Sequence, residues 1–202
     1  MLTLPDGSNL TLDEVLETVD AYSKNWPCVF DLYDSPDSGP HDDLRPIDLL
    51  SLNALNGWGN GQPMDAMTNA WLERDRISRA VAVVCITPLE QLTDAEAEAE
   101  VPKIAAAIEA IDDVKRFGPT TAAKLFHRLR PNLGPIWDRR MKKWYDPKEA
   151  WVPWVRRVYS QVREPQTLRC LLTARKHLRC PLSVLRVWDV VLWQRAPRLE
   201  LV

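Results

Sequence analysis

The sequence predicts an all-α protein. Helix-capping residues repeatedly precede runs in which apolar side chains recur every three or four positions, and alternating strand patterns are weak throughout. With 202 residues, the chain is long enough for one sizeable core or for two small lobes that share one. Its 46% hydrophobic and 27% charged residues are typical of a soluble globular protein.

The N-terminal segment predicts a short extended piece with a turn at Asp6-Gly7. Thr11 then caps a helix over 11–24, with Glu14 at the capping-box position. A Pro-rich connection follows, in which residues 28–32 favour a brief extended run.

Proline begins or interrupts the next helices. Pro46 opens a helix over 46–56 that Gly57 ends. A further helix is expected over 63–86, and Thr93 caps an acidic run that we expect to be solvated. Pro102 restarts a helix that ends near Asp113. The remaining helices are expected over residues 120–129, 138–145, 151–162, 165–178 and 182–193.

The charges divide the chain into two unlike halves. Residues 1–113 carry 6 Lys/Arg and 22 Asp/Glu, a net of −16, whereas residues 114–202 carry 20 Lys/Arg and 6 Asp/Glu, a net of +14. We therefore predict an acidic helical lobe over 1–113 and a basic one over 114–202, joined in one integrated fold. Such a basic half favours a nucleic-acid partner. The alternative is that the two halves bind each other or a partner protein, and that the split serves assembly only.

The cysteines and the hydropathy exclude several classes. The four Cys form no CxxC pair, and the three His are not spaced with them as ligands, so we expect no metal and no cofactor. The N-terminus is too polar and acidic for a signal peptide, and no apolar run approaches the ~20 residues of a membrane span. We expect a cytoplasmic protein without a membrane partner.

A Gly-Pro turn opens the basic half. Gly118 permits a tight turn, and Pro119 suits the first position of a helix because that N–H has no helical partner. Thr120 and Thr121 can add hydroxyl contacts, and Lys124 lies one turn further on. A helix N-terminus exposed by such a turn can hold a phosphate. The alternative is a packed helix connection that binds nothing.

Asp138 precedes the next helical run and is followed by Arg139 and Arg140. A carboxylate here can face a bound sugar, with the two arginines beside it on DNA. Asp is also a common N-cap, a role that needs no chemistry.

Residues 116–122, with the Ile136-Trp137-Asp138 element that follows, resemble the helix-hairpin-helix DNA glycosylase superfamily. Residues 48–56 and the sequence KLFHRLRP are also similar to a group of uncharacterised bacterial proteins related to that superfamily. The resemblance implies a helix-hairpin-helix motif within a two-lobed all-α fold.

The resemblance also implies roles for individual residues. Phe117, Gly118 and Thr120 would cradle a phosphate of double-stranded DNA. Asp138 would stabilise the positive sugar as a damaged or modified base departs. Trp137 and Trp144 would line the pocket for the flipped base.

The sequence departs from the family pattern in ways that narrow the chemistry. Thr120 stands where bifunctional members carry a Lys, so Schiff-base lyase chemistry at this position is excluded. Arg116 replaces the first hairpin Gly, and Arg139-Arg140 replace a Thr-His pair. With these departures, the resemblance implies a monofunctional glycosylase-like hydrolase acting through Asp138. The alternative is a helix-hairpin-helix protein that binds DNA without catalysis.

Overall fold

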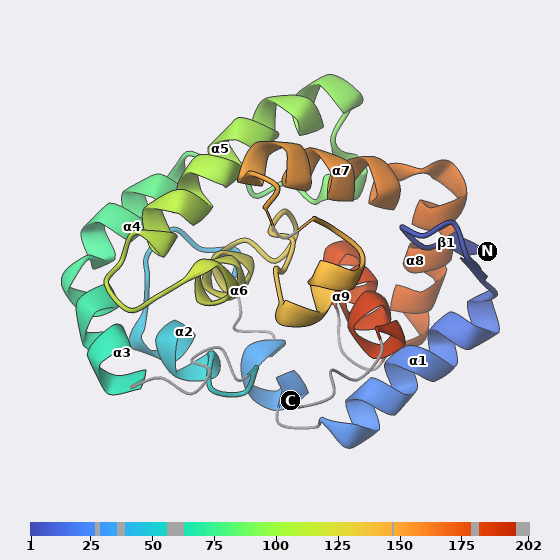
Figure 1. The fold of residues 1–202 in the computed structure, drawn as a ribbon, viewed down its shortest axis with the longest axis horizontal. Coiled ribbons are helices and arrows are strands. Elements are labelled where there is room, and N and C mark those ends of the chain that lie inside the picture. The colour runs from blue at the N-terminus through green and yellow to red at the C-terminus, as the bar shows by residue number, and fades with distance from the viewer. Residues whose placement is uncertain (27–28, 36–38, 56–62, 147, 179–181, 197–202) are drawn as a thin grey trace.

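The fold is built around one central helix. The computed structural model describes residues 1–26, 29–35, 39–55, 63–146, 148–178 and 182–196. In Figure 1, helix α6 (Pro119–Leu129) is seen almost end on near the centre, and the other helices surround it. The all-α prediction is confirmed, with a small two-stranded sheet at the N-terminus.

The first half begins with strands β1 (Leu2–Thr3) and β2 (Asn9–Leu10), which pair antiparallel around the predicted turn. Thr11 caps the following helix with a complete capping box, as expected. The remaining elements of this half are α1 (Leu12–Asn25), the π-helical turn η1 (Val29–Tyr33), α2 (Pro46–Ser51), α3 (Pro63–Leu72), α4 (Arg74–Ala82), η2 (Leu89–Gln91) and α5 (Asp94–Asp112).

The second half follows the predicted order closely. Its elements are α6, the 3₁₀ helix η3 (Arg139–Lys143), α7 (Trp151–Arg163), α8 (Pro165–His177) and α9 (Val184–Arg195). Helix α5 packs against both α6 and α7, and α9 packs against α1 and α8. The N-terminal half therefore contacts the C-terminal half along most of its length.

Four expectations are corrected. Residues 29–33 form a π-helical turn rather than an extended run, and Asp34 N donates to Val29 O (2.9 Å). The helix expected over 63–86 is two helices, α3 and α4. The helix expected over 46–56 ends at Ser51, and its predicted stop at Gly57 lies outside the described residues. The helix expected over 138–145 is the short 3₁₀ helix η3.

The acidic run is also different from the prediction. Pro102 lies inside α5 rather than at a helix start. An internal proline costs roughly 3 kcal/mol, but the same helix buries Val101, Ile104 and Ile108 and packs against α4, α6 and α7. Burial of that apolar face outweighs the lost hydrogen bond. Glu100, expected to be solvated, is buried and accepts the Cys85 N–H (3.0 Å).

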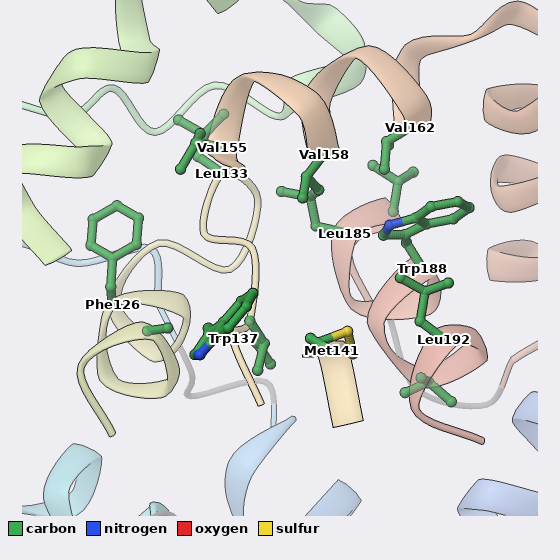
Figure 2. Close-up of a cluster of buried hydrophobic side chains, with 14 of the residues drawn as sticks. Phe126, Leu133, Trp137, Met141, Val155, Val158, Val162, Leu185, Trp188 and Leu192 are labelled. Atoms are coloured by element: carbon green, nitrogen blue, oxygen red, sulfur yellow. The ribbon is translucent and has the colours of Figure 1, made fainter. Parts of the chain in front are cut away.

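One hydrophobic core joins the two halves. Its buried side chains come from both sides of residue 113, from β1 to the end of α9. Figure 2 shows the part between α6, α7, η3 and α9, where Trp137 and Met141 lie between Phe126 of α6 and Trp188 of α9 in this view.

Many of the acidic residues of the first half bind basic residues of the second half within the molecule. Among the described residues, seven ion pairs join an acidic residue of 1–113 to a basic residue of 114–202. These pairs are Asp65–Arg116, Asp48–Arg128, Asp42–Arg130, Glu98–Arg156, Asp94–Arg163, Glu90–Arg175 and Asp34–Arg186. Much of the positive charge that the sequence assigned to a nucleic-acid surface therefore binds the other half of the same chain.

Candidate nucleic-acid interface

The turn before α6 has the backbone of a tight hairpin. Arg116 has φ of 70° and Gly118 has φ of 142°, both in the region that favours glycine. Phe117 N donates to Val114 O (2.9 Å), and Ala122 N donates to Gly118 O (2.9 Å). Arg116 thus adopts the left-handed conformation at the position where the resembling family has a glycine.

The backbone donors at the start of α6 are available. Pro119 has no N–H, and among the described residues neither Gly118 N nor Thr120 N donates a hydrogen bond to protein. A Cβ added at Gly118 would meet nothing within 4 Å, so the space beside the turn is open. Free N–H groups and the helix dipole make this an electropositive end.

The hairpin side chains are unequally accessible. Gly118 and Thr120 are half-buried, whereas Lys115 and Arg116 are exposed. Phe117 is half-buried and packs against the core. Thr121 is only 7% exposed, so its predicted phosphate contact is corrected: this residue faces the interior.

Lys124 is also not a surface cation. It is 4% exposed, and its Nζ contacts Asp138 Oδ2 (2.9 Å) and Leu55 O (3.0 Å). The predicted contact between Lys124 and phosphate is therefore wrong. This lysine instead joins the second turn of α6 to the start of η3.

Asp138 is a partly accessible carboxylate. Its side chain is 18% exposed, and its Oδ1 accepts the Arg140 N–H (3.1 Å), which caps η3. Burial by itself raises the pKa of this carboxyl, but the Lys124 ammonium and the Arg140 N–H outweigh it and hold the pKa below its usual range. Asp138 is thus an anion at neutral pH, with a structural role as an N-cap.

The two arginines after Asp138 behave differently. Arg139 is exposed. Arg140 places its guanidinium 3.9 Å from the centre of the Trp193 ring and donates to Trp193 O (3.1 Å). Lys142 and Lys143 beside them are exposed, so η3 presents a short basic surface next to Asp138.

Trp137 and Trp144 are core residues. Each is 8% exposed; Trp137 packs edge-to-face on Trp154, and Trp144 Nε1 donates to Leu192 O (3.1 Å). Neither lines a described cavity. A cavity lined by Trp154 and Asp189 measures about 10 Å³ and has no room for a base. The predicted base pocket at these two tryptophans is therefore corrected.

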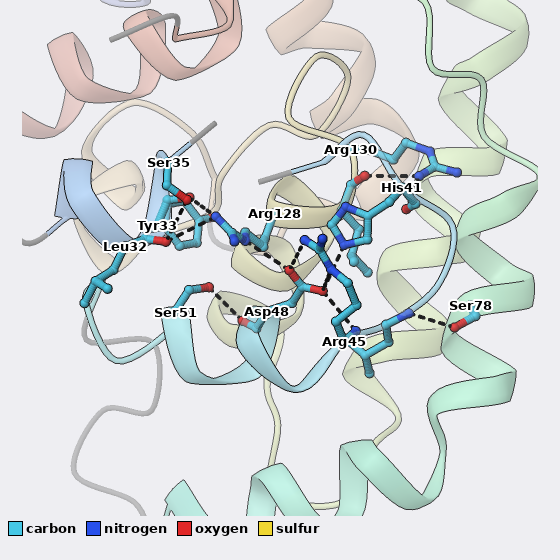
Figure 3. A network of polar contacts seen from close by, with 12 residues as sticks. Leu32, Tyr33, Ser35, His41, Arg45, Asp48, Ser51, Ser78, Arg128 and Arg130 are labelled. Carbon is cyan, nitrogen blue, oxygen red and sulfur yellow. Dashed lines mark hydrogen bonds and ion pairs between the residues drawn. The ribbon is translucent and has the colours of Figure 1, made fainter. Parts of the chain in front are cut away.

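The sequence reasoning missed a buried network centred on Asp48 (Figure 3). Asp48 accepts from Arg45 Nη2 (3.0 Å) and Arg128 Nε (3.1 Å), and it contacts His41 Nε2 (2.8 Å). Arg130 is buried nearby and contacts Asp42. The available signal in the sequence was the suggested resemblance of residues 48–56 and of KLFHRLRP to uncharacterised proteins, because these two segments contain Asp48, Arg128 and Arg130.

A second missed cluster surrounds Arg186 on α9. Its Nε and Nη2 donate to the two oxygens of Asp34 (2.9 and 3.1 Å), and its Nη1 donates to Asp189. Asp189 is buried, which raises its pKa to about 6 despite the Arg186 charge. The α9 sequence reads as a largely apolar helix with two cations, Arg186 and Arg195, and nothing in it indicates the partner at residue 34.

The described part of the chain contains no helix with the length and apolarity needed to cross a membrane. No curated protein matches the sequence, and no solved structure does. One family profile matches residues 15–196, which include α6, η3 and both buried arginine clusters. The chain therefore belongs to the family of unknown function DUF6308.

Proposed function

We propose that this protein binds the DNA backbone with the hairpin at residues 115–120. The observation that carries the proposal is that the N–H groups of Gly118 and Thr120, at the start of an 11-residue helix beside open space, have no acceptor among the described residues. Backbone donors of this kind bind phosphate oxygens, and the helix dipole favours the negative charge.

Nearby cations support the proposal. Lys115 and Arg116 precede the free N–H groups, and in the described part of the chain Arg116 makes a long contact with Asp65 (3.5 Å) between two half-exposed side chains. Such a pair contributes little and is readily exchanged for a phosphate. The Lys124–Asp138 contact holds the basic 3₁₀ helix η3 beside α6.

The glycine of the hairpin provides a matched test. Gly118→Ala is expected to weaken binding to a short fluorescent DNA duplex about tenfold, because φ of 142° is strained for any residue with a Cβ and the donors shift. Gly7→Ala is the control, since Gly7 also has positive φ (84°) and open space around its Cβ. Fluorescence anisotropy measures both. Equal affinities of the two variants would contradict the hairpin assignment.

Salt provides an independent measurement of the same surface. Wild-type affinity is expected to fall steeply between about 50 and 200 mM salt, because bound phosphates release counterions. Replacing Lys115 and Arg116 by Gln lowers that salt slope by about one for each phosphate that the variant no longer binds. Lys176→Gln, an exposed cation on α8, is the control. A slope that is flat, or equally changed by the control, rules out this surface.

A second function is favoured by the ionised state of Asp138: hydrolysis of the N-glycosidic bond of a modified base, without lyase chemistry. A carboxylate that stays anionic in a largely buried position stabilises an oxocarbenium-like sugar. Lys124 and the N-cap bond occupy its two oxygens, however, and this favours binding over catalysis.

Asp138→Asn separates the two functions. If the protein is catalytic, this variant loses at least about a hundredfold in abasic-site formation on DNA that carries modified bases, while duplex affinity is unchanged. The measurement is strand cleavage after alkali treatment of a panel of modified duplexes. Equal activity of the variant would exclude Asp138 as the catalytic group, and an inactive wild type would leave DNA binding as the function.

A further inference from the structure

An exposed pair of indole rings lies where the end of α1 meets the end of α9. Trp26 follows α1 and is 43% exposed, and its ring packs edge-to-face with Trp193 of α9, with the ring centres 5.7 Å apart. Helices α1 and α9 lie beside each other in Figure 1. The two rings form the Trp26–Trp193 surface. An indole this exposed has room for a second flat ring against it.

The 3₁₀ helix η3 brings cations to the Trp26–Trp193 surface. Such a helix has three residues per turn, so side chains three positions apart share an edge. Arg140 lies over the Trp193 ring, 3.9 Å from its centre, and donates to Trp193 O (3.1 Å). Arg139 and Lys142 share a different edge, and both are exposed. Their charges are therefore accessible to a ligand that reaches the two rings.

The charge of the segment around η3 is positive. Residues 138–148 carry five cations and two carboxylates, Asp138 and Asp146. Asp138 is already held by Lys124 (2.9 Å). The cations of this segment therefore exceed the acids, and an anionic ligand is favoured beside the rings.

The acidic face of α1 does not cancel this charge. The acid that precedes Trp26 most closely in the sequence is Asp20, and it contacts Lys24 (2.5 Å). The next acid, Glu17, is roughly 13 Å from Trp26 along the helix axis. That separation exceeds the Debye length at physiological salt, so solvent ions screen most of its effect.

The Trp26–Trp193 surface and the hairpin at 115–120 lie on adjoining elements. Lys124, one helical turn after Thr120, contacts Asp138, and Asp138 accepts the Arg140 N–H (3.1 Å) at the start of η3. Arg140 in turn lies on Trp193. A chain of contacts thus fixes η3 and its rings relative to the backbone donors of α6.

Exposed rings beside cations are the combination that single-stranded nucleic acids bind, because unpaired bases stack on the rings and phosphates contact the cations. We propose that the Trp26–Trp193 surface stacks an unpaired base, with Arg139 and Lys142 on the phosphates beside it. This inference rests on the proposed DNA binding by the hairpin, and it names the substrate class: a duplex with an adjoining single-stranded stretch.

Three dye-labelled DNA probes test the substrate class by fluorescence anisotropy at constant ionic strength. The first is a blunt duplex, and the second is the same duplex with a short single-stranded extension, made at either end of the strand. The third carries an extension of equal length without bases, so it has the same added phosphates. We expect the base-bearing extension to bind at least about fivefold tighter than the abasic one, because a base stacked on an aromatic ring contributes at least that factor.

Two exposed tryptophans provide a matched pair of variants. Trp26→Ala is expected to abolish the difference between the two extensions, and Trp26→Phe, which retains a ring, to keep part of it. Trp71→Ala is the control, since Trp71 is 38% exposed and also has an arginine, Arg74, against its ring (5.0 Å). Thermal melting reports whether each variant is folded. Equal effects of Trp26→Ala and Trp71→Ala would overturn the location.

The cations are tested by charge-matched variants. Replacing Arg139 and Lys142 by Gln should weaken binding of both extensions and lower the salt slope, whereas the same change at Arg169 and Lys176, two exposed cations of α8, should have little effect. Equal effects of the two double variants would exclude the η3 edge.

The same titrations separate this inference from the hairpin proposal. A loss of blunt-duplex affinity in Gly118→Ala reports on the hairpin, and the difference between base-bearing and abasic extensions reports on the Trp26–Trp193 surface. If Gly118→Ala weakens binding while the two extensions bind equally, this inference is wrong and the hairpin proposal stands. If neither effect is observed, both are wrong.

Discussion

Replacing Arg186 with Met is expected to lower the free energy of unfolding by about 3–5 kcal/mol. The arginine side chain is 3% exposed and binds two carboxylates, Asp34 (3% exposed) and Asp189 (7%). Without it, both acids remain in the interior with no cation between them. Urea denaturation measures the loss. Arg156→Met, which breaks an exposed pair with Glu98, is the control and is expected to cost much less, because solvent screens that pair.

The pH dependence of the Arg186→Met protein distinguishes lost charge pairing from lost packing. Burial already raises the pKa of Asp189 to about 6, and removing the Arg186 charge raises it further. A carboxyl whose folded pKa lies above its unfolded value binds protons preferentially in the folded state. The variant should therefore gain stability as the pH is lowered from about 7 to 5. A pH-independent loss would indicate a packing defect instead.

Asp48→Ala is expected to cost a similar amount, about 3–5 kcal/mol. This carboxylate is fully buried and lies between Arg45, Arg128 and His41, so its removal leaves a buried arginine unpaired. Asp48→Asn retains the shape and part of the hydrogen bonding, and it should be less damaging. Equilibrium unfolding in urea at neutral pH measures both. A loss below about 1 kcal/mol for Asp48→Ala would show that the network does not stabilise the fold.

Measurements of stability at acidic pH test whether ionisation of Asp48 is the cause of the loss. Burial by itself raises its pKa, but the contacts with His41 and Arg45 outweigh burial and hold the pKa far below the usual range. The stability that this group contributes is therefore complete above its unfolded pKa of about 4, and it is lost as the pH falls toward the folded pKa. The difference in stability between wild type and Asp48→Asn should narrow below pH 4. A constant difference would exclude ionisation of Asp48 as the cause.

Local signals in the sequence predicted most of the helices. The Thr11 capping box, the Gly118-Pro119 start of α6 and the proline starts of α2 and α8 are all present in the structure. Each depends on residues within one helical turn, so neighbours along the chain are sufficient to predict it. Pro102 is the exception, because long-range packing of α5 outweighs its local preference to begin a helix.

The candidate site was predicted less well, and the errors share one cause. Lys124 reads as an exposed cation in the sequence because lysine is seldom buried unless it is paired, and the sequence does not single out Arg128 or Arg186. The Arg128 partner is 80 residues away, and that of Arg186 is 152 residues away. The incorrect prediction of a pocket at Trp137 and Trp144 has a similar cause. A tryptophan near a candidate carboxylate can belong to the hydrophobic core or line a binding pocket, and the sequence does not distinguish the two.

The sequence by itself determined the all-α class, most of the helix starts and the glycine turn that exposes two backbone donors, because these depend on local conformational preference. Only the tertiary structure decided which charges face solvent. A cation is buried where the tertiary packing places an opposite charge from the other half of the chain beside it. Burying a charge without such a partner costs too much free energy. Among the described residues, the hairpin at 115–120 is a place where backbone donors remain without a protein acceptor after this internal pairing.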